Sequence, residues 1–143
     1  MKKVKIKYFS KYISPITFNS KGDWVDLRSA DTIVLKKGDF ALIPLGVGMK
    51  LPKGYEAHIA PRSSTFKNWG LLQTNSVAVI DNSYCGDKDE WKYPVYATRD
   101  VRIHLNDRIC QFRIVKKQPK FKFKLVLHLG KVSRGGFGST GSN

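Results

Sequence analysis

The sequence predicts an all-β fold, an antiparallel sandwich or barrel with one short helix. Apolar and polar residues alternate with a period of two along many short runs, such as residues 3–8, which is the pattern of a strand with one buried face. Glycine, proline, asparagine and aspartate separate these runs at close spacing, as antiparallel connections require. No long helical pattern lies between them, so the sequence argues against parallel strands joined by helices.

The expected strands follow one another along the chain, with turns between them. They cover residues 3–8, 24–28, 32–35, 40–49, 55–60, 71–73, 76–80, 92–98, 101–104, 108–116 and 121–129. The run 40–49 contains Pro44 and two glycines, which favours an edge strand or a bulge. The one expected helix runs from Ser63 or Ser64 through Asn68, since serine is a good N-cap and Gly70 can end it.

Length and composition fit one domain, residues 1–143. The glycine-rich end, residues 130–143, has too few apolar residues to form a core, and we expect a flexible arm there. No apolar stretch follows the basic N-terminus, so we expect no signal peptide and no membrane segment, and a soluble, cytoplasmic protein. Cys85 and Cys110 show no disulfide or metal-binding pattern and are expected to be free thiols.

The net charge of +15 at pH 7 indicates attraction to polyanions. In residues 3–8 and 120–125 the lysines alternate with apolar residues, so strand periodicity alone places them on a solvated face. A basic surface is therefore compatible with nucleic-acid binding but does not require it. A non-enzymatic module that binds nucleic acid or protein stays open as an alternative function, and a nucleic-acid or regulatory protein partner stays open as a second role.

One stretch, residues 75–87, combines features that suit a small ligand. The expected strand carries Val77 and Val79 on one face and ends at Asp81, whose side chain would project at the rim of the sheet. Tyr84 follows on the next turn. A carboxylate held beside an aromatic ring can bind a water molecule and pack a flat ligand, although an acid at a strand end is also ordinary turn chemistry.

Three other segments carry polar groups that suit nucleotide binding. Arg62 and three hydroxyl residues stand at the start of the expected helix, where free N–H groups attract phosphate; an ordinary helix cap beside a surface arginine is the alternative. Gln111 lies amid apolar residues and needs a polar partner, from the core or from a ligand. Phe137 stands in a glycine-rich segment suited to closing over a ligand. The three histidines show no metal spacing.

Together these segments resemble five short motifs of the homotrimeric dUTPases (deoxyuridine triphosphate nucleotidohydrolases), in the family's order and over roughly residues 22–141. The motifs are Asp26-Leu-Arg-Ser-Ala30, Ala60-Pro-Arg-Ser-Ser64, Val79-Ile-Asp-Asn-Ser-Tyr-Cys-Gly86, Asp107-Arg-Ile-Cys-Gln111 and Gly135-Gly-Phe-Gly-Ser-Thr-Gly141. The resemblance implies a jelly-roll-like β-barrel subunit in a homotrimer with shared active sites. It also implies the magnesium-assisted hydrolysis of dUTP to dUMP and pyrophosphate.

The resemblance assigns each motif a role. Asp81 matches the acid that activates the water attacking the α-phosphorus, and Tyr84 matches the ring that packs against the deoxyribose. Asp26 matches an acid near the water shell of magnesium, which the triphosphate mainly holds. The remaining matches contact the uracil (Asn75, Val79, Ile80 and the covering Phe137) or the phosphates (Arg62, Ser63, Ser64, Gln111, Gly138, Ser139 and Thr140).

Two departures from the family pattern are large. Residues 87–94 are charged and contain Pro94, where the family commonly has a hydrophobic strand. The arginine of the last motif is replaced by Val132, and Arg134, two residues later, is the candidate for its γ-phosphate contact. Among smaller departures, Asn106 replaces a turn glycine whose positive φ asparagine can adopt. A dCTP deaminase-like enzyme, which shares fold and pocket, remains the nearest alternative.

Overall fold

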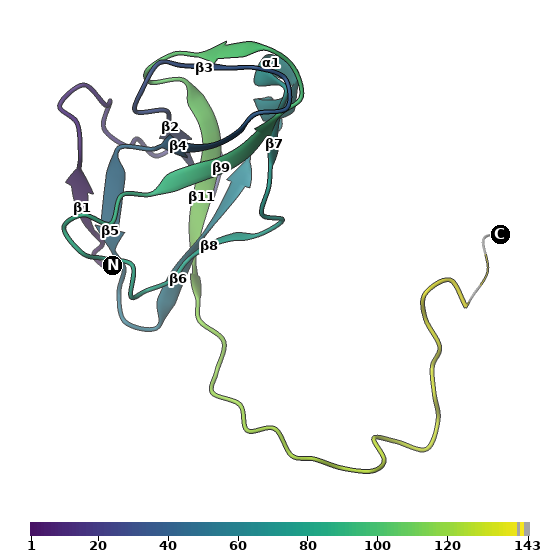
Figure 1. Ribbon diagram of the computed structural model, residues 1–143. Coiled ribbons are helices and arrows are strands. Elements are labelled where there is room, and N and C mark those ends of the chain that lie inside the picture. Colours follow the sequence, from purple (N-terminus) through teal and green to yellow (C-terminus); the bar gives the residue numbers. More distant parts are fainter. Residues whose placement is uncertain (140, 142–143) are drawn as a thin grey trace.

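The structure is a computed structural model that describes residues 1–139 and 141. It is built almost entirely from short strands with one short helix, in agreement with the predicted class (Figure 1). The elements are β1 (Lys5–Tyr8), β2 (Val25–Arg28), β3 (Ile33–Leu35), β4 (Phe40–Pro44), β5 (Val47–Lys50), β6 (Tyr55–Pro61), α1 (Thr65–Trp69), β7 (Leu71–Gln73), β8 (Ala78–Ile80), β9 (Lys92–Ala97), β10 (Val101–Ile103) and β11 (Arg108–Lys116).

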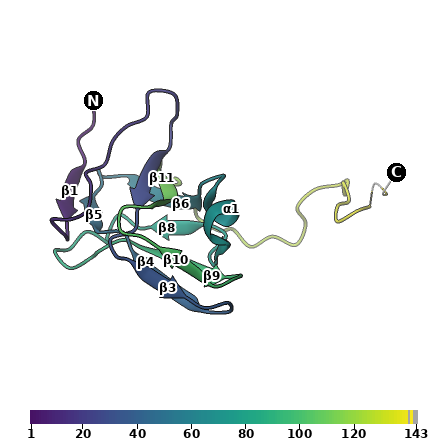
Figure 2. The same cartoon turned by 90° about the horizontal axis from the view of Figure 1, so that it is seen from above.

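The strands form a jelly-roll-like barrel in which every described pairing is antiparallel. The largest sheet has the order β2-β11-β6-β8, and a second sheet has the order β4-β9-β7. Two strand pairs, β1-β5 and β10-β3, complete the wall. Neighbours in a sheet are often distant in sequence, as β10 and β3 are, so the fold depends on long-range pairing (Figure 2).

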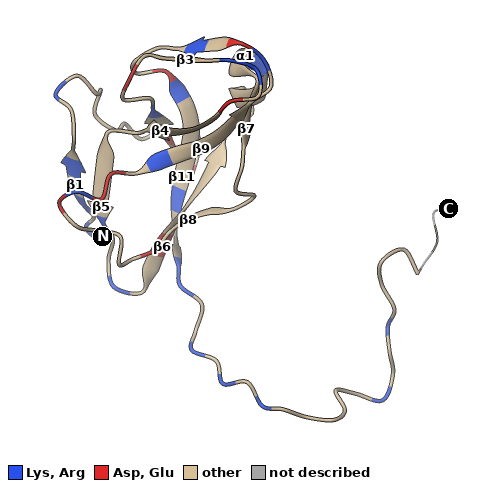
Figure 3. Ribbon diagram, in the orientation of Figure 1, with Lys and Arg blue, Asp and Glu red and all other residues tan. Residues whose placement is uncertain are grey.

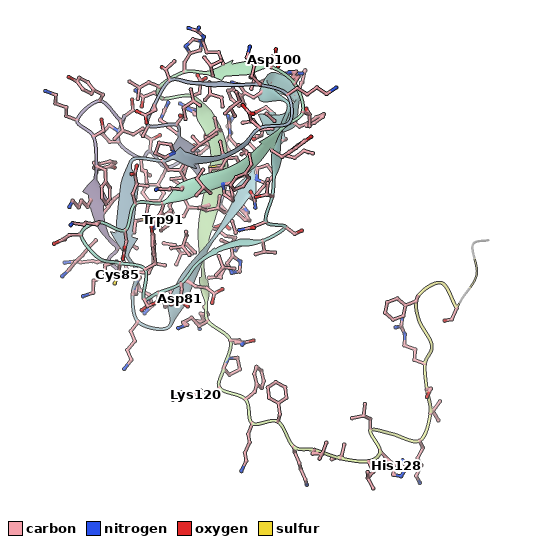
Figure 4. All side chains as sticks on the ribbon, in the orientation of Figure 1. Asp81, Cys85, Trp91, Asp100, Lys120 and His128 are labelled. Carbon is pink, nitrogen blue, oxygen red and sulfur yellow. The ribbon has the colours of Figure 1, made fainter. Side chains whose placement is uncertain are left out.

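Large aliphatic and aromatic side chains fill the interior of the barrel. Trp91 and Tyr93 are fully buried, and the Trp91 ring meets Phe112 edge to face with 5.3 Å between ring centroids. Trp91 and Tyr93 come from the segment 87–94, whose charged character set it apart from the family's hydrophobic strand. Trp91 points into the barrel directly before β9 (Figure 4), and Tyr93 is buried within β9, so the C-terminal end of the segment belongs to the core.

The structure confirms most of the expected strands and corrects two. The predicted strand 121–129 is wrong, because these residues form no strand and are exposed. The single predicted run 40–49 is two strands, β4 and β5, separated at Leu45 and Gly46. Gly46 has a φ of +69°, a conformation that glycine adopts without strain, and the chain turns there from one sheet into another.

The short helix α1 starts and ends close to where the sequence predicts. Ser64 stands at the N-cap, but its side chain makes no capping hydrogen bond. Thr65, the first helical residue, fixes the helix start instead, since its fully buried hydroxyl accepts from the Arg62 N–H just before the helix and donates to the Ile109 carbonyl, both at 2.8 Å. At the C-terminal end, Gly70 is left-handed and its N–H donates to the Phe66 carbonyl. The helix start is therefore tied to β11.

After β11 the chain leaves the barrel and runs outward (Figures 1 and 2). The last hydrogen bond to the barrel in the described chain is from the Lys117 N–H to the Gly54 carbonyl. Beyond it, the described part of the tail contains only local turns, such as the bond from the Ser139 N–H to the Gly136 carbonyl. No helix in residues 1–139 has the length and apolar character to cross a membrane.

Candidate active site

The Asp81 carboxylate stands directly after β8, as the sequence predicts, and Ser83 holds it in place. One carboxylate oxygen, Oδ1, accepts hydrogen bonds from the Ser83 N–H at 2.8 Å and from the Ser83 hydroxyl at 2.7 Å. These two bonds, the backbone one foremost, lower the pKa of Asp81 below its ordinary value. Asp81 is exposed and, with its lowered pKa, is an anion at neutral pH; both described hydrogen bonds to it use Oδ1 and leave Oδ2 for a further partner.

The loop that carries Asp81 is fixed on both sides. The Asn82 side-chain amide lies 3.0 Å from the Pro52 carbonyl and 3.1 Å from the Tyr55 carbonyl, which binds the loop to the turn before β6. The Tyr84 hydroxyl donates to the Glu90 carbonyl at 2.8 Å. These contacts place the carboxylate and the aromatic ring in a defined relation, which is what a pre-organised site needs.

Asp81 and Tyr84 line a hollow of about 470 Å³. Val79 and Ile80 form part of its wall, so four of the five predicted residues of this stretch share one cavity. Partial burial, with Asp89 and Glu90 nearby, raises the pKa of Tyr84, which therefore stays a neutral hydrogen-bond donor. A hollow with largely apolar walls, a neutral ring and two acidic residues, Asp81 and Glu90, suits a base and sugar better than a phosphate chain.

A second cluster gathers arginines around Asp26. The Arg62 Nε atom lies 3.0 Å from Asp26 Oδ1, and Arg108 Nη1 lies 3.7 Å from Asp26 Oδ2. Arg28 lies close enough that both arginines, after burial as the main cause, lower its pKa, while Asp26 opposes them. Three guanidinium groups around one carboxylate leave a net charge of +2, so the cluster favours a further anion.

The other predicted phosphate residues surround this second cluster. Gln111 stands opposite Asp26 in the β11–β2 register, and its side-chain amide donates to the Pro61 carbonyl at 3.1 Å. The Pro61 carbonyl is therefore the polar partner that Gln111 needs among its apolar neighbours. Ser63 is exposed and Ser64 half-buried at the start of α1, next to Arg62. The structure thus brings together the residues predicted from three separate motifs.

The two clusters lie at opposite ends of one strand. In the β6–β8 register Ile80 faces Ala57, so Asp81 lies level with Glu56, whereas Arg62 follows the far end of β6. Six residues of extended chain separate these positions by about 20 Å. A single chain therefore does not bring Asp81 to the arginines.

The remaining predicted residues lie apart from both clusters. Asn75 is exposed in the β7–β8 loop, where its carbonyl accepts from the Gln73 amide at 2.7 Å. Phe137 is fully exposed in the tail at a φ of +52°, and Arg134, Gly138 and Ser139 are exposed beside it. Thr140 lies outside the described residues. In one isolated chain the described part of the glycine-rich motif reaches neither cluster.

A family model described as dUTPase matches residues 15–141, most of the chain. The chain belongs to the dUTPase family. This dUTPase-family chain is 55% identical over 139 residues to the SPbeta prophage-derived deoxyuridine 5'-triphosphate nucleotidohydrolase YosS of Bacillus subtilis, with 97% of this chain and 98% of that protein covered. It is 36% identical to the deoxyuridine 5'-triphosphate nucleotidohydrolase of Finegoldia magna, with 96% of this chain and 99% of that protein covered.

Solved structures of phage dUTPases have the same fold as this dUTPase-family chain. The Staphylococcus bacteriophage 80alpha dUTPase with dUPNHPP superposes with a TM-score of 0.77 at 26% identity, over 99% of this chain and 100% of that one. A point mutant of the 80alpha phage dUTPase gives a TM-score of 0.80 at 22% identity, over 96% and 98% of the two chains. The second likeness shows the fold alone.

Sequence reasoning missed four side chains that shape this dUTPase-family site. Ser83 and Asn82 fix the Asp81 loop, and Arg28 and Arg108 complete the basic cluster. All four lie inside or beside the quoted motifs. For Ser83 a signal was present, because a hydroxyl two residues after an aspartate commonly closes an Asx turn. The arginine cluster had no local signal, since it forms only when β2, β6 and β11 pair.

Proposed function

We propose that the chain hydrolyses dUTP to dUMP and pyrophosphate, with Asp81 as the general base. The observation that carries the proposal is the Asp81 carboxylate, fixed through Oδ1 by Ser83 at a hollow that Tyr84, Val79 and Ile80 line. With Oδ1 occupied, Oδ2 is the atom that orients the attacking water and accepts its proton. Such a base contributes roughly a hundred- to ten-thousandfold to the rate.

The hollow beside Asp81 would receive the uridine. Val79 and Ile80 would flank the uracil together with the Asn75 loop, and the Tyr84 ring would pack against the deoxyribose. Because the Tyr84 hydroxyl is bound to the Glu90 carbonyl, the ring is held in place, and packed against the deoxyribose it would exclude a 2′-hydroxyl. This placement would bring the α-phosphorus toward Asp81.

The arginine cluster would receive the triphosphate. Arg62 has its Nη1 bonded to the Arg108 carbonyl and its Nε paired with Asp26, so its guanidinium is oriented before any ligand arrives. Ser63, Ser64 and Gln111 add hydroxyl, backbone and amide donors at the same end of the barrel. Pre-oriented donors stabilise the charge that develops on the leaving pyrophosphate.

Magnesium fits this arrangement as an ion that the substrate brings. Residues 1–139 contain no cluster of three or more His, Cys, Asp or Glu side chains arranged to hold a metal, and Asp26 stands as a lone carboxylate among arginines. Mg²⁺ commonly keeps several waters and binds substrate phosphates plus one or two carboxylates. Asp26 would therefore contact its water shell, and the ion would supply charge neutralisation on the phosphates.

The separation of the two clusters supports a homotrimer with shared sites. Asp81 of one subunit would face the arginine cluster of a second, and the glycine-rich motif would come from a neighbouring tail. Arg134, Phe137, Gly138, Ser139 and Thr140 would then close over the nucleotide. The support is geometric, because about 20 Å of β6 separates the two halves in one chain and the described tail leads away from both.

The Asp81→Asn variant tests the base. We expect it to bind a non-hydrolysable dUTP analogue with wild-type affinity and to release pyrophosphate roughly a hundred- to ten-thousandfold more slowly. The matched control is Asp31→Asn, which neutralises an exposed aspartate in the β2–β3 turn. Equal turnover in Asp81→Asn and wild type would remove Asp81 from the mechanism. Ammonia released from dCTP in the same assay would favour the deaminase-like alternative.

A complementation experiment tests the shared site. Subunits carrying Asp81→Asn and subunits carrying Arg62→Ala are each expected to be nearly inactive alone. When they are unfolded together and refolded, some interfaces combine an intact Asp81 with an intact Arg62, and activity returns. If the mixture stays as inactive as its components while the trimer forms, the two residues act from the same chain.

A further inference from the structure

One end of the barrel gathers lysines from three distant segments of the chain. These come from the N-terminus, from the β5–β6 turn and from the end of β11; we call them the basic end. They are Lys2, Lys5, Lys50, Lys53, Lys116 and Lys117. All six are exposed.

Backbone pairing and side-chain packing hold these segments together. Lys5 faces Lys50 in the β1–β5 register, and Lys116 faces Tyr55 in the β11–β6 register. The Lys2 ammonium lies 5.3 Å from the centre of the Tyr55 ring. The fold itself therefore concentrates the charge, and the period of two along a single strand does not account for it.

The tail continues this charge outward from the barrel. After Asp107 the sequence contains nine lysines and arginines and no aspartate or glutamate. Lys120, Lys122 and Lys124, the lysine strip, follow the basic end directly, and Figure 3 shows lysine and arginine but no aspartate or glutamate along the described tail. Figure 4 places Lys120 just beyond the end of the barrel that holds Asp81.

Within the described chain, no lysine of the basic end or of the lysine strip forms an ion pair. The four described pairs involve other residues, and the nearest acid on β6, Glu56, is bound to His58 at 2.6 Å. Like charges packed this closely repel one another and destabilise the folded state. A bound polyanion would offset that repulsion, and the release of its counterions would favour the complex.

We propose that the basic end and the lysine strip bind the sugar–phosphate backbone of nucleic acid without sequence preference. The set extends from the N-terminal strand across the barrel end and along the tail, further than one nucleotide reaches. The triphosphate of a single nucleotide is already matched by the arginine cluster at the opposite end of β6. A long anion is therefore the ligand whose charge the surface fits.

The alternation of lysine and phenylalanine along residues 120–124 leaves the lysine side chains free to bind a ligand. Phe121 and Phe123 have the opposite parity from Lys120, Lys122 and Lys124, so in an extended chain the two sets face opposite sides. If the aromatic side packs against protein, the lysines still face solvent. If it stays exposed, the rings offer stacking surfaces for unpaired bases.

The test compares two triple variants with a control of equal charge loss. Lys50→Gln, Lys53→Gln and Lys116→Gln neutralise half of the basic end, and Lys120→Gln, Lys122→Gln and Lys124→Gln neutralise the strip. The control replaces Lys36, Lys37 and Lys67 by glutamine; these exposed lysines lie on the β3–β4 turn and on α1. Fluorescence anisotropy measures the binding of the full chain to a single-stranded oligothymidylate of about 20 nucleotides and to a duplex of that length.

Wild type and control are expected to bind with affinity that falls steeply as salt rises. Each lost phosphate contact on a single strand lowers the salt slope by about 0.7, so a triple variant loses about 2 and binds roughly a hundredfold more weakly near 0.1 M salt. Equal weakening in the control, absent wild-type binding, or equally tight binding to phosphatidylserine vesicles would overturn the proposal. A triple variant with a lower kcat/KM for dUTP and unchanged oligonucleotide binding would also overturn the proposal.

Turnover of dUTP is measured on the same samples to separate this proposal from the proposed function. A wild-type chain that binds the oligonucleotide but does not hydrolyse dUTP would refute the enzyme assignment and leave the nucleic-acid surface standing. A chain that hydrolyses dUTP but does not bind the oligonucleotide would refute the nucleic-acid surface and leave the enzyme assignment standing.

Discussion

Replacing Thr65 by valine removes the hydroxyl that joins the start of α1 to β11, at almost constant side-chain volume. In the native chain this hydroxyl is fully buried, accepts from the Arg62 N–H and donates to the Ile109 carbonyl. Valine leaves both backbone groups without that partner. An unsatisfied buried group costs about 1 to 3 kcal/mol, and the Arg62 N–H is only half-buried, so we expect a loss of about 2 to 4 kcal/mol.

The assay is thermal and urea unfolding at fixed subunit concentration, because assembly shifts apparent stability by mass action. For a chain of this length the expected loss lowers the melting temperature by roughly 10 °C. Thr65→Ser is the matched control, since it keeps the hydroxyl and removes one methyl group. A valine variant as stable as wild type, or a serine variant as unstable as the valine one, would refute the hydrogen-bond argument.

Two further predictions concern catalysis. In Ser83→Ala the Asp81 carboxylate loses one of the hydrogen bonds that lower its pKa, so the acid limb of the plot of kcat/KM against pH moves to higher pH. Ser83→Thr keeps the hydroxyl and is expected to leave that limb in place. An unmoved acid limb in the alanine variant would contradict the role of Ser83. Deleting residues 130–143 is expected to lower turnover strongly while far-UV circular dichroism and oligomer size stay unchanged, because the described part of this segment makes no hydrogen bond to the barrel. Full activity after deletion would exclude a role for Phe137.

Periodicity predicted the strands well wherever a partner edge exists. The strand predicted at 121–129 failed although its alternation of lysine with apolar residues is clear. Alternation predicts which side chains would lie on each face of a strand, but a strand also needs the free edge of a neighbouring strand to pair with. β11 already pairs with β6 on one side and β2 on the other, and within one chain the described tail meets no free edge. Its apolar side chains, such as Leu125, remain exposed.

The candidate site likewise contains residues that are close in sequence and residues that only the pairing of distant strands brings together. Asp81, Tyr84, Val79 and Ile80 are close in sequence, so one strand end and its turn bring them together, and the sequence predicted that grouping. The ion pair between Asp26 and Arg62 joins residues from β2 and the end of β6, which contact each other only because β11 pairs with both. The resemblance placed Asp26 near magnesium, but the arginines around it became visible only in the fold.

A bulge in β11 decides which of its side chains reach the arginine cluster. The pairing with β2 shifts between Arg108 and Cys110, and Ile109 and Cys110 are both fully buried although they are neighbours. Strict alternation outward from Gln111 would turn Ile109 to solvent and bury Arg108 without a partner, which costs several kcal/mol. The extra residue keeps Arg108 and Gln111 on the face that carries Asp26. The arginine cluster therefore depends on this irregular pairing, because the same sequence without the bulge would turn Arg108 away from Asp26 even though every motif residue remained.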